Sequence, residues 1–200
     1  MFQRNLFYMR ITGGLFRSRV IKEPRHIRPT QDKVRKSLFD ILRGVISHAC
    51  FLELFAGSGA VGIDALSNGA KQVIFVENDR RCCKIIEDNL RQLGLLVKES
   101  DQRKNIAILA TDAFKAIEVL SKENRKFDIV FLDPPYYKEL AKKSLQKLVA
   151  YDILAPHALV VVEHSKKDLL AEVFSDLKCF KQTRYGDTVL SFYEKEDVAL

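Results

Sequence analysis

Five short apolar runs, separated by longer amphipathic stretches, constrain the fold of this chain more than any other feature. They are FLELF (51–55), KQVIFVE (71–77), NIAILAT (105–111), FDIVFLD (127–133) and ALVVVEH (158–164). Each run is rich in Val, Ile, Leu or Phe and is apolar on both faces of a strand. Such runs are typical of a parallel sheet that helices cover on both sides.

The amphipathic stretches between these runs predict helices. The expected ranges are 59–68, 79–93, 112–121, 138–151 and 166–175, with Asp79, Asp112 and Ser165 as amino-terminal caps. A further helix is expected over 32–47 with Thr30 as its cap, and residues 10–27 predict a small irregular or hairpin arm. Two β-like runs around Gly186 and Asp187 predict a closing antiparallel hairpin. The alternation as a whole predicts a doubly wound α/β sheet.

Composition is consistent with one folded domain. The 200 residues are 47% apolar and 30% charged, with no run near the roughly 20 apolar residues of a membrane span. The amino terminus lacks the features of a secretory signal, so a cytoplasmic protein is expected. The four cysteines (Cys50, Cys82, Cys83 and Cys179) form no metal-type pair, which predicts reduced thiols and no metal site.

Positive charge is concentrated in the first quarter of the sequence. Residues 1–48 contain eleven Lys or Arg and three acids, a balance of +8, whereas the remaining residues balance at −1. A localised basic region is the electrostatic footprint of a protein that binds a polyanion. The alternative is a solvated basic surface without a partner.

A glycine loop follows the first of the five apolar runs. LFAGSGAVG (54–62) places Gly57, Gly59 and Gly62 at the spacing G-x-G-x-x-G, and Glu77 ends the next run. This spacing suits a tight turn whose backbone approaches a ligand, and a dinucleotide-binding fold has the same pattern. A turn used only for close helix packing is the structural alternative.

Acidic residues at three successive strand ends favour S-adenosyl-L-methionine over NAD or FAD. Glu53 would repel a pyrophosphate but suits the ammonium and sulfonium of S-adenosylmethionine. Glu77 can accept hydrogen bonds from the ribose hydroxyls, and Asp112 can reach the adenine amino group. Three such acids are hard to explain by packing.

The tetrapeptide Asp133-Pro134-Pro135-Tyr136 ends the fourth run at the same expected edge of the sheet. The prolines stiffen the loop and leave its carbonyl groups available, so Asp133 and the Pro134 carbonyl can accept the two hydrogens of an exocyclic amine. Tyr136 offers a stacking face worth roughly 1 to 3 kcal/mol. The expected chemistry is direct in-line attack of the amine on the sulfonium methyl, helped by orientation. A turn that merely ends a strand is the alternative.

These motifs resemble the bacterial 16S rRNA guanine-N2 methyltransferases, the family named for guanine 966. The resemblance runs from about residue 9 to 193 and rests on RITGGLFRSRVI (10–21), RPTQDKVRKSLFDIL (28–42), LELFAGSGAVGIDALSNGA (52–70), VIFVEND (73–79), TDAF (111–114), FDIVFLDPPY (127–136), VVVEH (160–164) and YGDTVLSFY (185–193). It implies a Rossmann-like methyltransferase fold with a seven-stranded, mostly parallel sheet. The expected division is an arm over 1–27 and a methyltransferase domain over 28–200.

The resemblance also implies the site residues. Cofactor binding is expected at Arg28, Pro29, Thr30, Glu53, Phe55, Ala56, Gly57, Ser58, Gly59, Gly62, Glu77, Asn78, Asp112 and Ala113, and the catalytic residues are Asp133, Pro134, Pro135 and Tyr136. RNA contacts are expected from Arg10, Arg17, Arg19, Arg25, Arg28, Arg35 and Lys36. The implied substrate is 16S rRNA in a 30S subunit or an assembly intermediate, and the enzyme is expected to be a monomer.

Other functions share some of these motifs. A DNA methyltransferase acting on adenine N6 or cytosine N4 would need a sizeable element to read base edges, and only the arm and the 94–105 loop are available. A structured RNA with an accessible single-stranded base is therefore favoured. A binding protein without chemistry, or an NAD enzyme, would have no need of the stiff loop at Asp133.

Overall fold

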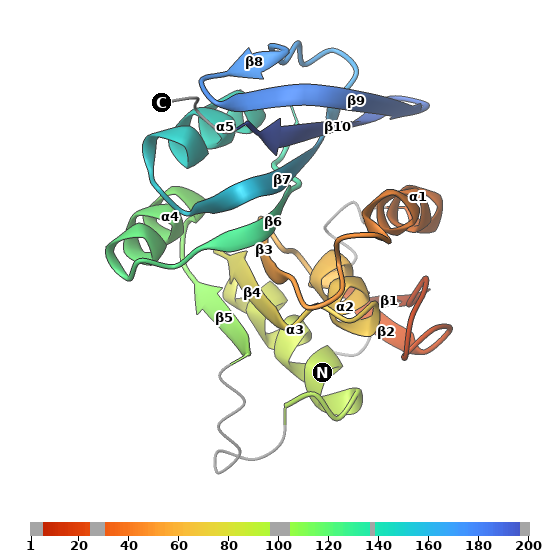
Figure 1. Ribbon diagram of the computed structural model, residues 1–200. Coiled ribbons are helices and arrows are strands. Elements are labelled where there is room, and N and C mark those ends of the chain that lie inside the picture. The colour runs from red at the N-terminus through yellow and green to blue at the C-terminus, as the bar shows by residue number, and fades with distance from the viewer. Residues whose placement is uncertain (1–5, 25–30, 97–104, 137–138, 197–200) are drawn as a thin grey trace.

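An eight-stranded sheet forms the centre of the computed structural model, which describes residues 6–24, 31–96, 105–136 and 139–196 (Figure 1). Five strands run parallel in the order β5-β4-β3-β6-β7, and the antiparallel strands β10, β9 and β8 continue from β7. The parallel strands are β3 (Cys50–Leu54), β4 (Gln72–Glu77), β5 (Ile106–Ala110), β6 (Phe127–Leu132) and β7 (Leu154–Ser165). The others are β8 (Val173–Phe174), β9 (Leu177–Tyr185) and β10 (Thr188–Lys195). This order confirms the predicted doubly wound sheet with its closing hairpin.

Five helices in the described ranges cover the two faces of the sheet. They are α1 (Asp32–Leu42), α2 (Ala60–Ser67), α3 (Arg80–Gln92), α4 (Ala113–Lys122) and α5 (Leu140–Ala150). Successive residues of β3 belong to two separate cores. Phe51 is in the core with residues of α1, α2 and α3, and Leu52 is in the core with residues of α4 and α5. Because successive strand side chains point to opposite faces, apolar residues at both positions bury both faces of β3.

Two of the predicted caps are present. The Asp79 side chain accepts a hydrogen bond from the Arg81 backbone at 2.8 Å, and Asp112 accepts one from Phe114 at 2.8 Å. Each satisfies a backbone N–H that the helix itself leaves without a partner. Helix α1 ends at Leu42 instead of continuing to residue 47, and Thr30 lies outside the described residues.

The helix predicted over 166–175 is wrong. This segment forms turns followed by the short strand β8, and Leu169 is 91% exposed, so no apolar face is present to support a helix. The Ser165 hydroxyl accepts from the Lys167 backbone within a turn, at 3.2 Å. Strand β8 pairs with β9 and gives the sheet eight strands instead of the implied seven.

The amino-terminal hairpin is fixed to the body of the protein. Strands β1 (Leu6–Arg10) and β2 (Val20–Pro24) pair antiparallel, and Ile21 is buried in the core shared by α1, α2 and α3. The Lys22 backbone N–H donates to Asn89 of α3 at 2.8 Å, and the Asn89 amide donates back to the Lys22 carbonyl at 3.0 Å. The hairpin therefore shares its core with the large sheet.

Arg35 is fully buried and holds three elements together. Its guanidinium donates to Asp64 of α2 at 2.5 Å, to Asp32 of α1 at 2.7 Å and to the Arg10 carbonyl of β1 at 2.8 Å. The expectation that Arg35 contacts RNA is not met, because its side chain has no exposed surface. The sequence pattern could not separate this arginine from the exposed basic residues around it.

Two further observations concern the helices and the cysteines. Among the helices of the described ranges, none combines the length and apolar character that crossing a membrane requires. Cys50, Cys82, Cys83 and Cys179 are free thiols.

Candidate active site

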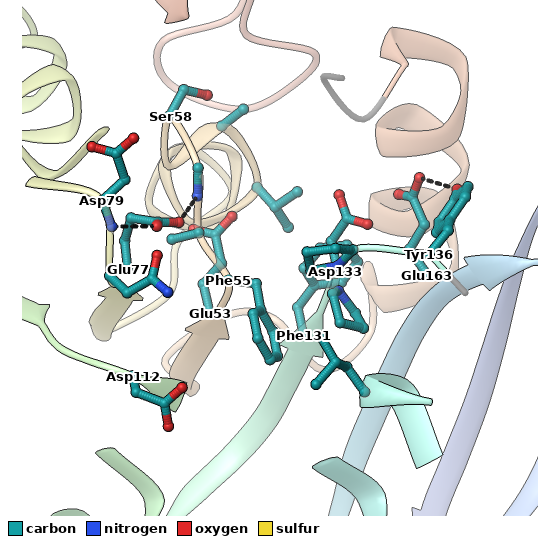
Figure 2. Close-up of a pocket in the computed structure, with 18 of the residues that line it drawn as sticks. Glu53, Phe55, Ser58, Glu77, Asp79, Asp112, Phe131, Asp133, Tyr136 and Glu163 are labelled. Carbon is teal, nitrogen blue, oxygen red and sulfur yellow. Dashed lines mark hydrogen bonds between the residues drawn. The ribbon is translucent and has the colours of Figure 1, made fainter. Parts of the chain in front are cut away.

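A cavity of about 630 Å³ opens at the carboxyl ends of β3 and β6 (Figure 2). From β3 the chain winds toward β4 and β5, and from β6 it winds toward β7, so these two strands form the point where the direction of winding reverses. Ligands of open α/β sheets bind at this point. The volume is within the range of small-molecule and cofactor sites.

Most of the residues expected in the site line this cavity. They are Glu53, Phe55, Ala56, Gly57, Ser58, Glu77, Asn78, Asp112, Asp133, Pro134, Pro135 and Tyr136. The expected cofactor residues Arg28, Pro29 and Thr30, and the expected RNA contact Arg25, lie outside the described residues. The fold thus brings the glycine loop, three acidic strand ends and the Asp133 loop into one cavity.

Gly59, Gly62 and Ala113 are not part of the cavity wall. Gly62 serves packing, because a Cβ atom there would lie 2.4 Å from the Phe75 ring and 2.6 Å from the Glu53 carboxylate. Part of the cavity wall was not predicted from the sequence. These residues are Glu23, Ala60, Val61, Asp79, Phe114, Phe131, Leu140 and Glu163. Asp79 and Phe114 directly follow the predicted residues Asn78 and Ala113. Glu23 lies in none of the motifs, and Glu163 lies in VVVEH (160–164), for which no role in the site was predicted.

The loop after β3 has an unusual backbone. Phe55, Gly57 and Gly59 have φ angles of 60°, 55° and 74°, in the left-handed region that disfavours a side chain. Phe55 is not a glycine, and residues held in this region cluster at ligand sites. Turns with left-handed residues can direct backbone N–H groups toward a bound polar group.

Glu77 anchors this loop to the next strand end. Its carboxylate accepts from the Gly57 backbone N–H and from the Asp79 backbone N–H, both at 2.8 Å (Figure 2). A carboxylate offers about four lone-pair positions, so two remain for a pair of ribose hydroxyls. Asp112 uses one oxygen, Oδ1, to cap α4, and its side chain also lines the cavity. The two acids fit the nucleoside half of S-adenosylmethionine.

Glu53 lies at the base of the loop and is 2% exposed. Its carboxylate accepts a hydrogen bond from the Gly62 backbone N–H at 2.9 Å, which lowers the pKa of Glu53. Burial has the larger and opposite effect and raises this pKa to about 8. A buried carboxylate disfavours a phosphate and favours a cation that would restore its charge. Glu53 therefore fits the ammonium-bearing half of S-adenosylmethionine.

The affinity for S-adenosylhomocysteine, which retains the ammonium group, is expected to rise with pH from 6.5 to about 8. Glu53 is largely protonated in the free protein below its pKa of about 8, and a bound ammonium group lowers that pKa, so binding releases a proton. Calorimetry at pH 6.5, 7.2 and 8.0 should show up to tenfold tighter binding per pH unit. Glu53→Gln should flatten the profile, and the exposed Glu194→Gln should not; a flat wild-type profile would contradict this role.

Glu23 brings the amino-terminal hairpin into the cavity. It lies on β2, is 2% exposed, and accepts a short hydrogen bond from the Ser58 hydroxyl of the glycine loop. Burial raises the pKa of Glu23, while the Ser58 bond opposes the shift. The hairpin thus contacts the glycine loop, which lines the cavity that the cofactor would occupy.

The Asp133 loop forms the other end of the cavity. The Asp133 backbone N–H donates to the Leu54 carbonyl at 3.5 Å, which holds the loop beside the end of β3. Pro134 is buried, Asp133 and Tyr136 are half-buried, and all three line the cavity. The Tyr136 hydroxyl donates to Glu163 at 3.3 Å and lies 3.1 Å from the Thr188 hydroxyl. The Tyr136 ring is therefore held at its outer end.

The exposed basic residues of the arm lie on the hairpin and on α1. Arg10, Arg17, Arg19 and Lys36 are exposed. Arg19 lies over the Phe16 ring at 5.5 Å and donates to the Gln92 carbonyl at 2.8 Å. These contacts hold the Arg19 side chain in one orientation but leave it accessible.

Fold and site together define the chain as an S-adenosylmethionine-dependent methyltransferase. It belongs to the family described as Conserved hypothetical protein 95, whose model matches residues 9–194, and the resemblance seen in the motifs is confirmed.

Three known proteins illustrate this membership. The chain is 36% identical to ribosomal RNA small subunit methyltransferase D of Haemophilus influenzae over 79% of each chain. It is 31% identical to the Escherichia coli protein of the same name, over 94% of this chain and 90% of the relative. The solved structure of the Escherichia coli protein yhhF superposes with a TM-score of 0.81, at 30% identity and over 95% of this chain and 99% of the other.

Proposed function

We propose that this enzyme methylates the exocyclic N2 amine of a guanine in 16S rRNA, guanine 966 in the family's terms, using S-adenosyl-L-methionine. The observation that carries the proposal is the single cavity that joins the glycine loop to the Asp133 loop. Relatives named ribosomal RNA small subunit methyltransferase D support the RNA substrate. We propose the small ribosomal subunit, or an intermediate of its assembly, as the particle that is modified.

The chain's own residues account for the chemistry mainly by orientation. Asp133 and the Pro134 carbonyl accept the two hydrogens of the amine, which directs the nitrogen lone pair toward the cofactor end of the cavity. Tyr136 supplies the face on which the base stacks. The cofactor, when bound, supplies a methyl group on a sulfonium. As the N–C bond forms, the C–S bond breaks, and the acidic proton of the methylated amine then leaves to Asp133 or water.

Cofactor residues act at the opposite end of the same cavity. Glu77 and Asp112 would hold the nucleoside half, and Glu53 would hold the ammonium group. Because these acids lie on the ends of neighbouring strands, the sheet itself fixes their positions relative to Asp133. No residue with a strong basic function is required, since the amine attacks before it loses its proton.

Incubation with tritiated S-adenosylmethionine tests the substrate. Label is expected in 16S rRNA or in 30S particles and not in duplex DNA, and nuclease digestion with mass spectrometry should yield N2-methylguanosine. Label found only in DNA would overturn the proposal and favour an adenine-N6 or cytosine-N4 methyltransferase. A thermal shift with S-adenosylhomocysteine but not with NAD would separate the proposal from a dinucleotide enzyme.

Neutralising the hairpin cations should weaken RNA binding and reduce its dependence on salt. Each phosphate contact contributes about 0.7 to 0.9 to the slope of log K against log salt, so Arg17→Gln with Arg19→Gln should lower the slope by about 1.4 to 1.8. The matched control is Lys178→Gln with Lys181→Gln, which removes the same charge from the exposed side of β9. Equal slopes for the wild type and the hairpin variant would show that Arg17 and Arg19 do not contact the RNA.

A further inference from the structure

A second carboxylate, Glu163, lies next to Asp133 at the base end of the cavity. The parallel strands β6 and β7 pair Leu132 with Val162, so Asp133 and Glu163 are the next residues along neighbouring strands. Both side chains line the cavity, and Figure 2 shows both at the end away from Glu77 and Asp112. Glu163 is only 5% exposed, so its carboxyl group lies in a largely dry site, where polar groups need hydrogen-bond partners.

The contacts around Glu163 mark it as a hydrogen-bond acceptor. The Tyr136 hydroxyl donates its one proton to Glu163 Oε1 at 3.3 Å, so the Thr188 hydroxyl, 3.1 Å from the same tyrosine, must donate to the Tyr136 oxygen. This chain of donors runs from Thr188 through Tyr136 and ends on the carboxylate. A carboxylate has about four lone-pair positions, so the bond from Tyr136 does not exhaust the acceptor capacity of Glu163, which lines the cavity.

We propose that Glu163 selects guanine by accepting its ring N1–H, beside the amine held by Asp133 and the Pro134 carbonyl. This inference rests on the proposed function and names the residue that determines its base specificity. In guanine the amine and N1–H are adjacent donors, and two neighbouring acceptors match them. In adenine and cytosine the ring nitrogen beside the amine carries a lone pair, which would face a carboxylate. Such a contact leaves two acceptors opposed in a dry site and disfavours the wrong base.

The base analogue 2-aminopurine tests this contact, because it keeps the 2-amino group but has a lone pair on N1. It also lacks the O6 carbonyl, so the response of the preference to Glu163→Gln separates loss of N1–H from loss of O6. Small ribosomal subunits are reconstituted with 16S rRNA ligated to carry guanine or 2-aminopurine at the methylated position, and transfer of tritiated methyl groups is measured. Wild type should prefer guanine by about 30-fold or more in kcat/KM, as expected for a lost hydrogen bond to a charged group. In Glu163→Gln the amide can donate to the N1 lone pair, so the preference should fall below about threefold.

Two variants separate this role from a structural one. Tyr136→Phe removes the donor to Glu163 but keeps the ring, so it should slow both substrates alike and preserve the wild-type preference. The exposed Glu194→Gln, on the same sheet, should change neither rate. If Glu163 acted only by holding Tyr136, Glu163→Gln and Tyr136→Phe would give the same pattern. Unchanged S-adenosylhomocysteine affinity in Glu163→Gln shows that the cavity is folded.

The outcomes for the inference and for the proposed function are distinct. Wild-type enzyme that methylates 2-aminopurine as fast as guanine overturns the inference without any variant, and so does a Glu163→Gln enzyme with the full wild-type preference. A wild-type enzyme without a preference for guanine overturns the inference even if the variant fails to fold. If the wild type places no methyl group on a guanine amine of the small subunit, the proposed function fails instead.

Discussion

Asp133→Ala is expected to lower kcat/KM for methyl transfer by about 1000-fold and to change the S-adenosylhomocysteine dissociation constant less than about threefold. Asp133 lies at the base end of the cavity, beyond the residues that fit the cofactor, and its proposed role is to orient the amine. Without the carboxylate the amine would be free to rotate, so the loss should appear in transfer. Single-turnover rates and calorimetry on the same preparation measure the two quantities.

The matched variant for Asp133 is Glu77→Ala at the opposite end of the cavity. Glu77 holds the Gly57 and Asp79 backbone N–H groups and has acceptor positions left for the ribose. Its removal should weaken S-adenosylhomocysteine binding by about 10 to 100-fold while saturating cofactor restores most of the rate. Similar losses of binding and of rate in both variants would show that this division of roles is wrong.

Arg35→Met is expected to lower the free energy of unfolding by about 3 to 5 kcal/mol. The substitution leaves the buried Asp64 carboxylate without its charge partner and the Arg10 carbonyl without its donor. Urea titration measures the change, and coincident transitions in far- and near-ultraviolet circular dichroism establish that unfolding is two-state. The exposed pair of Arg43 and Asp40 provides the matched control, and Arg43→Met should cost less than about 1 kcal/mol.

A double variant identifies the cause of that loss. Asp64→Asn keeps the acceptor for the Thr12 backbone N–H but removes the uncompensated charge. Combined with Arg35→Met, it should therefore recover part of the lost stability. If Arg35→Met and Arg43→Met are equally mild, the buried arginine does not hold the hairpin to α1 and α2.

The parallel part of the sheet could be predicted because its apolar runs are compatible with few structures other than buried strands. Phe51 and Leu52 pack into opposite cores, so the apolar run around them has to be a strand covered on both faces. The region after β7 was harder, because Leu169 and Leu170 look like the start of an apolar helix face when the sequence is considered alone. In the structure Leu169 is 91% exposed, and hydrogen bonding in this region comes from turns and from pairing with β9.

The site could be predicted where its residues belong to a loop that directly follows a strand. The glycine loop and the Asp133 loop follow strands, and parallel strands place such loops on one edge of the sheet. Glu23 and Glu163 were missed because their positions depend on how separate elements pack. Glu23 reaches Ser58 from a hairpin 35 positions away, and Glu163 becomes a neighbour of Asp133 only through the β6–β7 register. Arg35 was misassigned because charge alone does not reveal burial.

The continuous cavity between Glu77 and Tyr136 has a consequence for inhibitor design. A single molecule that joins an adenosyl group to a purine could occupy both ends while losing translational and rotational freedom only once. Its affinity could then exceed that of either fragment alone by orders of magnitude. Selectivity would have to come from the purine half, because a glycine loop with acidic strand ends is a general solution for holding a nucleoside.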